Sequence, residues 1–126
     1  MSRQDYFWIK CMDLGAAWGC HQIPERSFVY KGYQFPICAR CTGVFISTIF
    51  AYIVYNKKRF PLWINLIMAT SMVIDASIQY MKIKESNNLR RFITGCLGGF
   101  GITTIRIYIY IFLLKITRSV YRTIKI

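Results

Sequence analysis

The sequence predicts an all-α integral membrane protein that forms one domain over residues 1–126. Of these residues 55% are hydrophobic, and the apolar ones gather in three long runs flanked by basic clusters. The chain has 17 lysines and arginines against 5 acidic residues, a net charge of +12 that would suggest nucleic acid as the partner of a soluble domain. Here the charges flank apolar runs that a domain this small could not bury. We therefore expect membrane lipids as partners, with anionic lipids favoured by the basic flanks, and no nucleic acid.

Three uncharged or nearly uncharged runs are the expected transmembrane helices, at 41–56, 60–81 and 92–114. At about 1.5 Å per residue the first would be roughly 24 Å long, short for a ~30 Å hydrocarbon core. Arg40 and Lys57 could extend this helix by reaching outward to the interfaces. The second run contains one charge, Asp75, and the third contains one, Arg106. A basic tail, 115–126, follows, and the sequence predicts a multi-pass protein of the cell membrane.

Residues 1–40 form a different kind of segment, because charges interrupt every apolar stretch. Aromatic residues mixed with charges predict a helix over 4–18 at the lipid–water interface, followed by a Cys/His segment. A surface helix of a soluble cap is the alternative. We expect no removable signal peptide, because no uninterrupted apolar stretch precedes a cleavage site. Similar numbers of lysines and arginines fall on the two sides of three spans, so the positive-inside rule leaves the orientation open.

Cys20-His21 and Cys38-Ala39-Arg40-Cys41 are the candidate metal ligands. A C-x-x-C pair brings two thiolates to one turn, the spacing that zinc sites use, and Cys20 and His21 would complete the set. Neighbouring side chains tend to diverge, so we expect Cys20 to bind zinc or another transition metal and His21 to stay free to move protons near neutral pH. The alternative is a closed tetrahedron in which both are ligands.

Two other interpretations of the cysteines remain open. Cys38 and Cys41 begin a helix, whose dipole would lower a thiol pKa, as in thiol–disulfide exchange with Cys20 as the resolving thiol. Alternatively, Cys20 and Cys38 could form a structural disulfide. Cys11 and Cys96 lack partners at metal spacing, so simple burial is expected for both.

A polar cluster is expected on the membrane face that carries the cysteines. Ser71, Asp75 and Gln79 recur every four residues, and Asp75 lies about 9 Å below that face, close to Arg90 or Arg91. Arg106 lies about 21 Å below it, too deep to pair with Asp75, and is expected to reach the opposite interface. The candidate catalytic residues are His21, Asp75, Glu85 and Arg91. The expected supporting polar residues are Gln22, Arg26, Arg40, Gln79 and Asn88.

Small residues line the predicted helix contacts. Gly43, Ser47 and Ala51 share one face of the first run, and Gly95 and Gly98 lie on the face of the third run that begins at Arg91. Small residues let helix backbones approach closely in a membrane. We expect three tightly packed helices beneath the polar cluster.

The longest motif is Cys20-His21-Gln22-x-x-x-Arg26-Ser27-Phe28, continued by Gly32-Tyr33-Gln34-Phe35-Pro36-Ile37-Cys38-Ala39-Arg40-Cys41-Thr42-Gly43. It resembles a family of small uncharacterised prokaryotic integral membrane proteins, defined as a domain of unknown function. The similarity continues in Asp75-x-x-x-Gln79 and in Glu85-Ser86-x-Asn88-x-x-Arg91-x-x-Thr94-Gly95, and so covers most of 20–99. One departure is Ala76, where the family would have glycine. The resemblance implies membership and a shared polar cluster, and it brings no established reaction.

Three functions are consistent with these residues. The first is a zinc enzyme at the membrane interface, a hydrolase or transferase, in which Asp75 or Glu85 accepts a proton and Arg91 holds a lipid phosphate or a peptide carboxylate. The second is a thiol–disulfide oxidoreductase that uses Cys38 and Cys41. The third is a non-enzymatic membrane protein with a structural zinc site. A channel or carrier would require a homo-oligomer, and no nucleotide loop, serine elbow or HExxH motif occurs.

Overall fold

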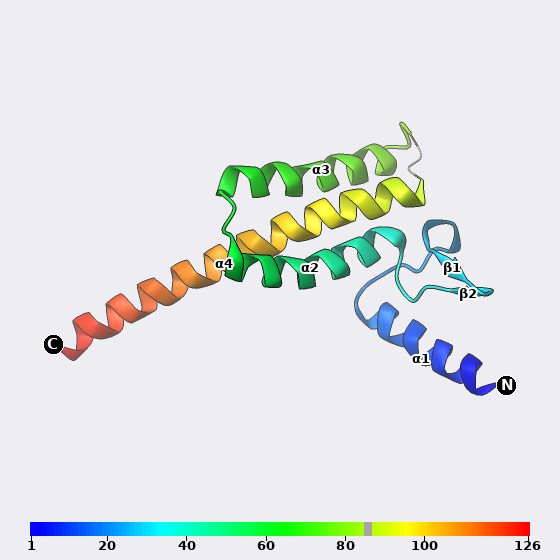
Figure 1. Cartoon of the computed structure of the whole chain (residues 1–126), viewed down its shortest axis with the longest axis horizontal. Helices are drawn as coiled ribbons and strands as arrows, with labels where there is room; N and C mark the ends of the chain where they lie inside the picture. The colour runs from blue at the N-terminus through cyan, green and yellow to red at the C-terminus, as the bar shows by residue number, and fades with distance from the viewer. Residues whose placement is uncertain (85–86) are drawn as a thin grey trace.

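Three long helices lie side by side and alternate in direction along the chain, and a short N-terminal region sits at one end of them (Figure 1). The structure is a computed structural model that describes residues 1–84 and 87–126. The long helices are α2 (Ala39–Lys57), α3 (Leu62–Tyr80) and α4 (Asn88–Lys125). The N-terminal region consists of α1 (Arg3–Ala17), a 3-10 turn η1 (Pro24–Arg26), β1 (Val29–Tyr30) and β2 (Tyr33–Gln34). The all-α prediction is therefore confirmed, apart from one small hairpin that the sequence analysis did not predict.

Each predicted apolar run corresponds to one long helix, and the limits differ most at α4. The run at 41–56 is α2 and the run at 60–81 is α3, with ends that differ by two residues or fewer. The third helix begins four residues earlier than the run at 92–114 and continues through the basic tail to Lys125. Among the described residues, α3 and α4 are long and apolar enough to cross a membrane.

Helix α4 lies between α2 and α3 and packs against both (Figure 1). The contacts depend on glycine, because a Cβ added at Gly95 would collide with the carbonyl oxygen of Arg40 and one at Gly101 would lie 2.5 Å from that of Asn65. Thr48 and Thr103 add a hydroxyl–hydroxyl hydrogen bond of 3.1 Å between α2 and α4. The predicted small-residue faces are therefore the faces at which these helices meet.

Large apolar side chains lie on the outside of this three-helix unit and small or polar ones lie inside. The buried hydrophobic residues of the described chain are Ala39, Ala51 and Phe100, whereas Asn65, Asp75 and Arg91 are buried as well. Side chains such as Phe50, Trp63 and Ile67 are more than half exposed. This distribution is the reverse of the one expected for a soluble domain.

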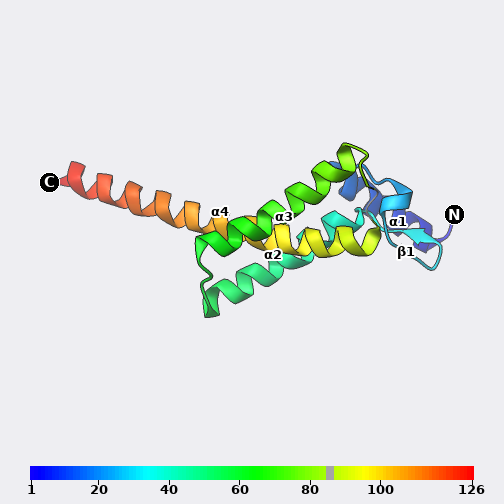
Figure 2. The same ribbon diagram turned by 90° about the horizontal axis from the view of Figure 1, so that it is seen from above.

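The second half of α4 extends beyond the other two long helices (Figure 2). Every residue from Phe112 to Ile126 is exposed. This part of α4 carries the four basic residues of the tail, Lys115, Arg118, Arg122 and Lys125. The tail is therefore a basic helical extension rather than an irregular segment.

Helix α1 is held against the hairpin by a few specific hydrogen bonds. Trp8 Nε1 donates to the carbonyl of Gln34 over 2.8 Å, and Gln22 Nε2 donates to the carbonyls of Met12 and Pro36. The hairpin turns at Lys31 and Gly32, which have φ values of 50° and 81°. Helix α1 thus agrees with the expected helix at 4–18, and the Cys/His segment is placed beside the start of α2.

Candidate metal centre

Three cysteines from separate parts of the chain meet at the start of α2. The Sγ atoms of Cys20, Cys38 and Cys41 all lie within 4.8 Å of one another. A tetrahedral zinc ion with Zn–S bonds of about 2.3 Å separates its sulfurs by about 3.8 Å, a distance that falls within this limit. The three close cysteines could therefore hold a metal ion, as the motif predicts. All five cysteines of the chain are free, so the alternative of a Cys20–Cys38 disulfide is wrong for this structure.

The local backbone explains how these sulfurs come together. Cys38 is the N-cap residue of α2, and its Sγ accepts a hydrogen bond of 3.5 Å from the backbone N–H of Cys41. The backbone N–H of Cys38 in turn donates to Cys20 Sγ over 3.1 Å. The first turn of α2 thus places Cys38 and Cys41 one turn apart. The hydrogen bond from the Cys38 backbone holds Cys20, in the preceding loop, beside them.

Hydrogen bonds at this helix start favour the thiolate form of Cys38. The pKa of Cys38 is lowered to about 5, and the hydrogen bond from the Cys41 thiol is the largest cause of this shift. Burial opposes the shift, whereas the Cys41 backbone N–H and contacts from Cys20 and Arg40 add to it. Metals bind the thiolate form of cysteine, and reactive thiols use it as well. This state is therefore compatible with both the metal and the thiol interpretations.

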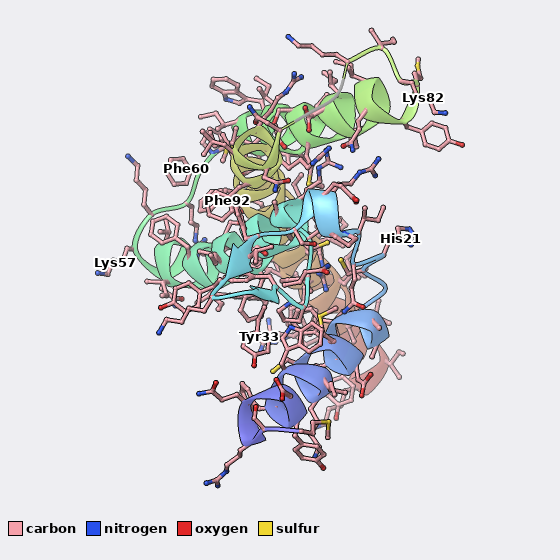
Figure 3. The ribbon with its side chains drawn as sticks, turned by 90° about the vertical axis from the view of Figure 1, so that its right-hand side faces the viewer. His21, Tyr33, Lys57, Phe60, Lys82 and Phe92 are labelled. Atoms are coloured by element: carbon pink, nitrogen blue, oxygen red, sulfur yellow. The ribbon has the colours of Figure 1, made fainter. Side chains whose placement is uncertain are left out.

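His21 lies apart from the three sulfurs. It is exposed, it does not belong to the group of close ligand atoms, and it projects from the loop between α1 and η1 (Figure 3). A site in which Cys20, His21, Cys38 and Cys41 all coordinate one ion is therefore not the arrangement seen. The expected divergence of Cys20 and His21 explains the difference, because the backbone that turns Cys20 toward Cys38 turns its neighbour away.

A cavity of about 220 Å³ lies beside the cysteines, and His21 is part of its wall. Its polar lining is dominated by three guanidinium groups, those of Arg26, Arg40 and Arg91, together with Gln79. No described carboxylate contributes to this lining. The cavity is therefore a positively charged space that opens next to three sulfur ligands.

Asp75 lies behind this cavity in an ionic network rather than in its wall. Its side chain is 3% exposed, its Oδ2 lies 2.7 Å from a guanidinium nitrogen of Arg40, and its Oδ1 lies 2.6 Å from Nε of Arg90. The hydroxyl of Thr94 also contacts Oδ2 at 3.3 Å. The predicted proximity of Asp75 to Arg90 is confirmed. This geometry favours a role in holding Arg40 over a role as proton acceptor.

Arg40 differs from its prediction. The sequence analysis expected it to reach outward and lengthen the first span, whereas it points inward and bonds both Asp75 and Gln79, the latter at 3.1 Å. The attraction of a buried carboxylate outweighs contact with the interface, because an unpaired charge inside a helix bundle is costly. The sequence does place the two residues near the same end, because Arg40 lies in the first turn of α2 and Asp75 lies five residues before the end of α3.

Gln79 and Asn88 connect the arginines to one another. Gln79 Oε1 accepts from Arg40 and, at 3.4 Å, from Nε of Arg91. Asn88 Oδ1 accepts from Arg91 over 3.0 Å, and the Asn88 amide donates to the carbonyl of Ser27. The buried atoms Gln79 Nε2 and Arg40 Nε have no hydrogen-bond partner among the described residues. Gln79 and Asn88 thus hold Arg40 and Arg91 in position beside the cavity.

The remaining predicted residues take other positions. Gln22 donates to the carbonyl of Met12 in α1 and to that of Pro36 before α2, which makes it a structural residue as well as part of the cavity wall. Arg26 lines the cavity and forms no ion pair with a residue that the structure describes. Cys11 and Cys96 are half-buried and stay outside the sulfur group. Glu85 lies outside the described residues, so its expected catalytic role stays a prediction.

Comparison with known proteins identifies the family. A family model described as "Predicted membrane protein (DUF2085)" matches residues 20–105. The chain is 35% identical over 92 residues to an uncharacterized protein of Methanothermobacter thermautotrophicus, covering 68% of this chain and 82% of that one. It is 37% identical over 90 residues to an uncharacterized protein of Methanocaldococcus jannaschii, covering 66% of this chain and 58% of the relative. No solved structure matches.

The matched segment contains the three cysteines, the arginine-lined cavity and most of the helix contacts, whereas α1 and the end of α4 lie outside it. The resemblance to a family of uncharacterised membrane proteins is thus confirmed at the level of the family. This chain belongs to the DUF2085 family of predicted membrane proteins.

Proposed function

We propose that this protein is a three-span membrane metalloenzyme in which Cys20, Cys38 and Cys41 hold zinc, with the fourth coordination position facing the arginine-lined cavity. The observation that carries the proposal is the contact between a three-sulfur group and a cavity rich in guanidinium groups. A structural zinc site is closed by four protein ligands, whereas a catalytic one keeps a position for water or substrate.

The donor set suits zinc. Three sulfur atoms in a half-buried pocket at a helix N-terminus are soft ligands, and they are kept near one another by backbone hydrogen bonds rather than by a disulfide. Zinc bound there would supply Lewis acidity and an activated water molecule. Other transition metals that prefer thiolate ligands fit the same three sulfurs.

Residues around the metal would then bind the substrate and transfer protons. Arg26 and Arg91 bind an anionic group of the substrate, a phosphate of a lipid or a carboxylate of a peptide, because guanidinium groups pair well with both. Asp75 and Gln79 orient Arg40 toward the same space. His21, exposed at the cavity wall, transfers protons to and from the substrate.

The proposed membrane setting is supported by the arrangement of side chains. Helices α2, α3 and α4 expose large apolar residues and meet through glycine, serine and threonine, which is the pattern of helices packed in lipid. The cysteine end and the Lys57 end would lie at opposite interfaces, α1 would rest at the first, and anionic lipids would contact the basic flanks. In this setting α2 also crosses the membrane, which gives three spans.

A second function is favoured by one specific observation. Cys38 and Cys41 are free, lie one turn apart and begin a helix, as in enzymes of dithiol–disulfide exchange. In that reaction Cys38 and Cys41 would become a disulfide while a disulfide of a partner protein is reduced to two thiols.

The coordination of the metal tests the first proposal. We expect the zinc X-ray absorption spectrum of the purified protein to report three sulfur ligands and one oxygen, unchanged in a His21→Gln variant. In the same variant, turnover of anionic lipid or peptide substrates should be lost. A spectrum with an imidazole ligand that disappears in this variant would indicate a closed structural site. Absence of metal combined with oxidation of Cys38 and Cys41 would indicate the thiol enzyme.

A further inference from the structure

A second and larger cavity lies at the opposite end of the three-helix unit from the cysteines. It has a volume of about 710 Å³, within the range of small-molecule sites. It is formed where α2 ends and α4 continues, and its lining includes Tyr52, Tyr55, Asn56, Arg106, Tyr110 and Leu113. Arg40 and Tyr55 are fifteen residues apart on α2, so the two cavities are about 22 Å apart along the helix. The metal centre and this cavity are therefore separate sites.

Polar groups in this second cavity are available to a ligand. The Tyr55 hydroxyl is buried and has no hydrogen-bond partner within residues 1–84 and 87–126. Its ring is fixed in place, since Tyr108 packs against it with ring centroids 5.6 Å apart and the guanidinium of Arg59 lies 5.4 Å from its centroid. Arg106 is exposed and forms no ion pair with a described residue. The wall of this cavity thus contains a guanidinium without an ion pair and a phenol without a hydrogen bond among the described residues.

The chain itself has no anion to place there. Its five acidic residues are Asp5, Asp13, Glu25, Asp75 and Glu85, so α2, the loop after it and α4 contain none. Asp75 is already paired with Arg40 and Arg90 at the other end of α3. The end near Arg106 carries Lys57, Lys58, Arg59 and the basic stretch of α4 with no carboxylate to neutralise them. An anion at this cavity must come from outside the chain.

We propose that this cavity binds the phosphate headgroup of an anionic phospholipid. Arg106 donates two hydrogen bonds to the phosphate, Tyr55 and Asn56 donate further ones, and Tyr52 and Tyr110 flank the headgroup at the level of the interface. Ile109 and Leu113 add apolar surface to the cavity wall. The inference rests on the membrane placement proposed above and is independent of the metal.

Lipid binding to the full chain in neutral detergent tests this inference. The probes are short-chain phosphatidylglycerol, short-chain phosphatidylcholine and inorganic phosphate, with binding measured by native mass spectrometry and by the shift in melting temperature. We expect phosphatidylglycerol to bind most tightly and Arg106→Gln to weaken its binding by about tenfold or more. Tyr55→Phe should weaken it by about threefold, whereas Arg118→Gln, on the same helix outside the cavity, should change it less than twofold.

Several results would overturn the inference. Equal affinity of the wild-type chain for phosphatidylglycerol and phosphatidylcholine would mean that the charge is not recognised, and this comparison needs no variant to fold. Equal loss in Arg106→Gln and Arg118→Gln would mean nonspecific attraction to the basic helix. Binding of inorganic phosphate as tight as that of the lipid would identify a free-phosphate site. Release of the protein from membranes by alkaline carbonate would refute the membrane placement instead.

Discussion

Asp75 takes part in both ion pairs found among the described residues. Its two carboxylate oxygens pair with Arg40 of α2 and Arg90 of α4, so a single side chain of α3 joins all three long helices. The other helix contacts are made largely by small residues, so we expect this network to fix how the three helices align along their lengths. The network also sets the position of Arg40 in the cavity wall.

Asp75→Asn should destabilise the three-helix unit. Asparagine has nearly the same shape but no charge, so two guanidinium groups lose their counter-ion in a mostly buried position. We expect a loss of about 1–3 kcal/mol in the free energy of unfolding, measured by thermal melting in detergent. Asp13→Asn, at an exposed position of α1, is the control and should change it by less than about 0.5 kcal/mol. Unchanged melting in both variants would show that the network contributes nothing to stability.

Asp5 provides a residue-level test that depends on pH. The Tyr33 hydroxyl donates to its carboxylate over 2.7 Å and, with bonds from Ser2, lowers the pKa of Asp5 below its ordinary value. A lowered pKa in the folded state stabilises the fold at higher pH, and this contribution disappears as the pH falls through that pKa. Tyr33→Phe should raise the pKa of Asp5, so the contribution would be lost at a higher pH.

Titration of the Asp5 carboxyl carbon by NMR measures this effect. Tyr30→Phe is the control, because Tyr30 is exposed and forms no contact with Asp5 among the described interactions. A pKa of Asp5 that moves equally in both variants, or in neither, would contradict the contact between α1 and the hairpin.

Among the helices, α4 packs against both α2 and α3 and so sets their positions. Its glycines allow α2 on one side and α3 on the other to approach the backbone, and Gly95 meets the carbonyl of Arg40 directly. This places Arg40, and with it the cavity wall, at a fixed distance from Arg91. The packing of the helices and the geometry of the candidate site are therefore linked.

Gly95→Leu should disrupt this contact. A leucine side chain would have to displace the first turn of α2, so we expect a loss of about 1–3 kcal/mol in the free energy of unfolding, or a failure to fold. Ser77→Leu adds the same side chain at an exposed position of α3 and should have little effect. Circular dichroism melts of the two variants give the comparison. Equal stability of the two would mean that α2 and α4 do not pack through Gly95.

Much of this arrangement could be predicted from apolar runs and residue spacing. The small-residue faces, the helix at 4–18 and the proximity of Cys20, Cys38 and Cys41 each depend on local periodicity or on a short motif. The hairpin at 29–34 could not, because it consists of two two-residue strands whose register depends on contacts with α1. The inward turn of Arg40 also could not, since it is decided by the partner available in three dimensions.

At the scale of the whole molecule, charge is divided between two ends. Asp5, Asp13, Glu25 and Asp75 lie at one end with the sulfur group and the cavity of Arg26 and Arg91 (Figure 1). At the other end, the charged side chains that the structure describes around Arg106 are all basic. In the proposed membrane setting these ends face opposite interfaces. The first end has the groups for chemistry on an anionic substrate, and the second has the groups for holding an anionic lipid.

The claim on which the proposed function depends most is that the three cysteines bind a metal. Elemental analysis of the full chain, purified from membranes without chelator or affinity metal, tests it most directly. We predict about one zinc per chain in the wild type and almost none in Cys41→Ser, which removes one of three ligands. A Cys96→Ser control, outside the sulfur group, should retain the wild-type amount. A folded wild-type chain without metal, or equal zinc in the Cys41→Ser and Cys96→Ser variants, would contradict the account.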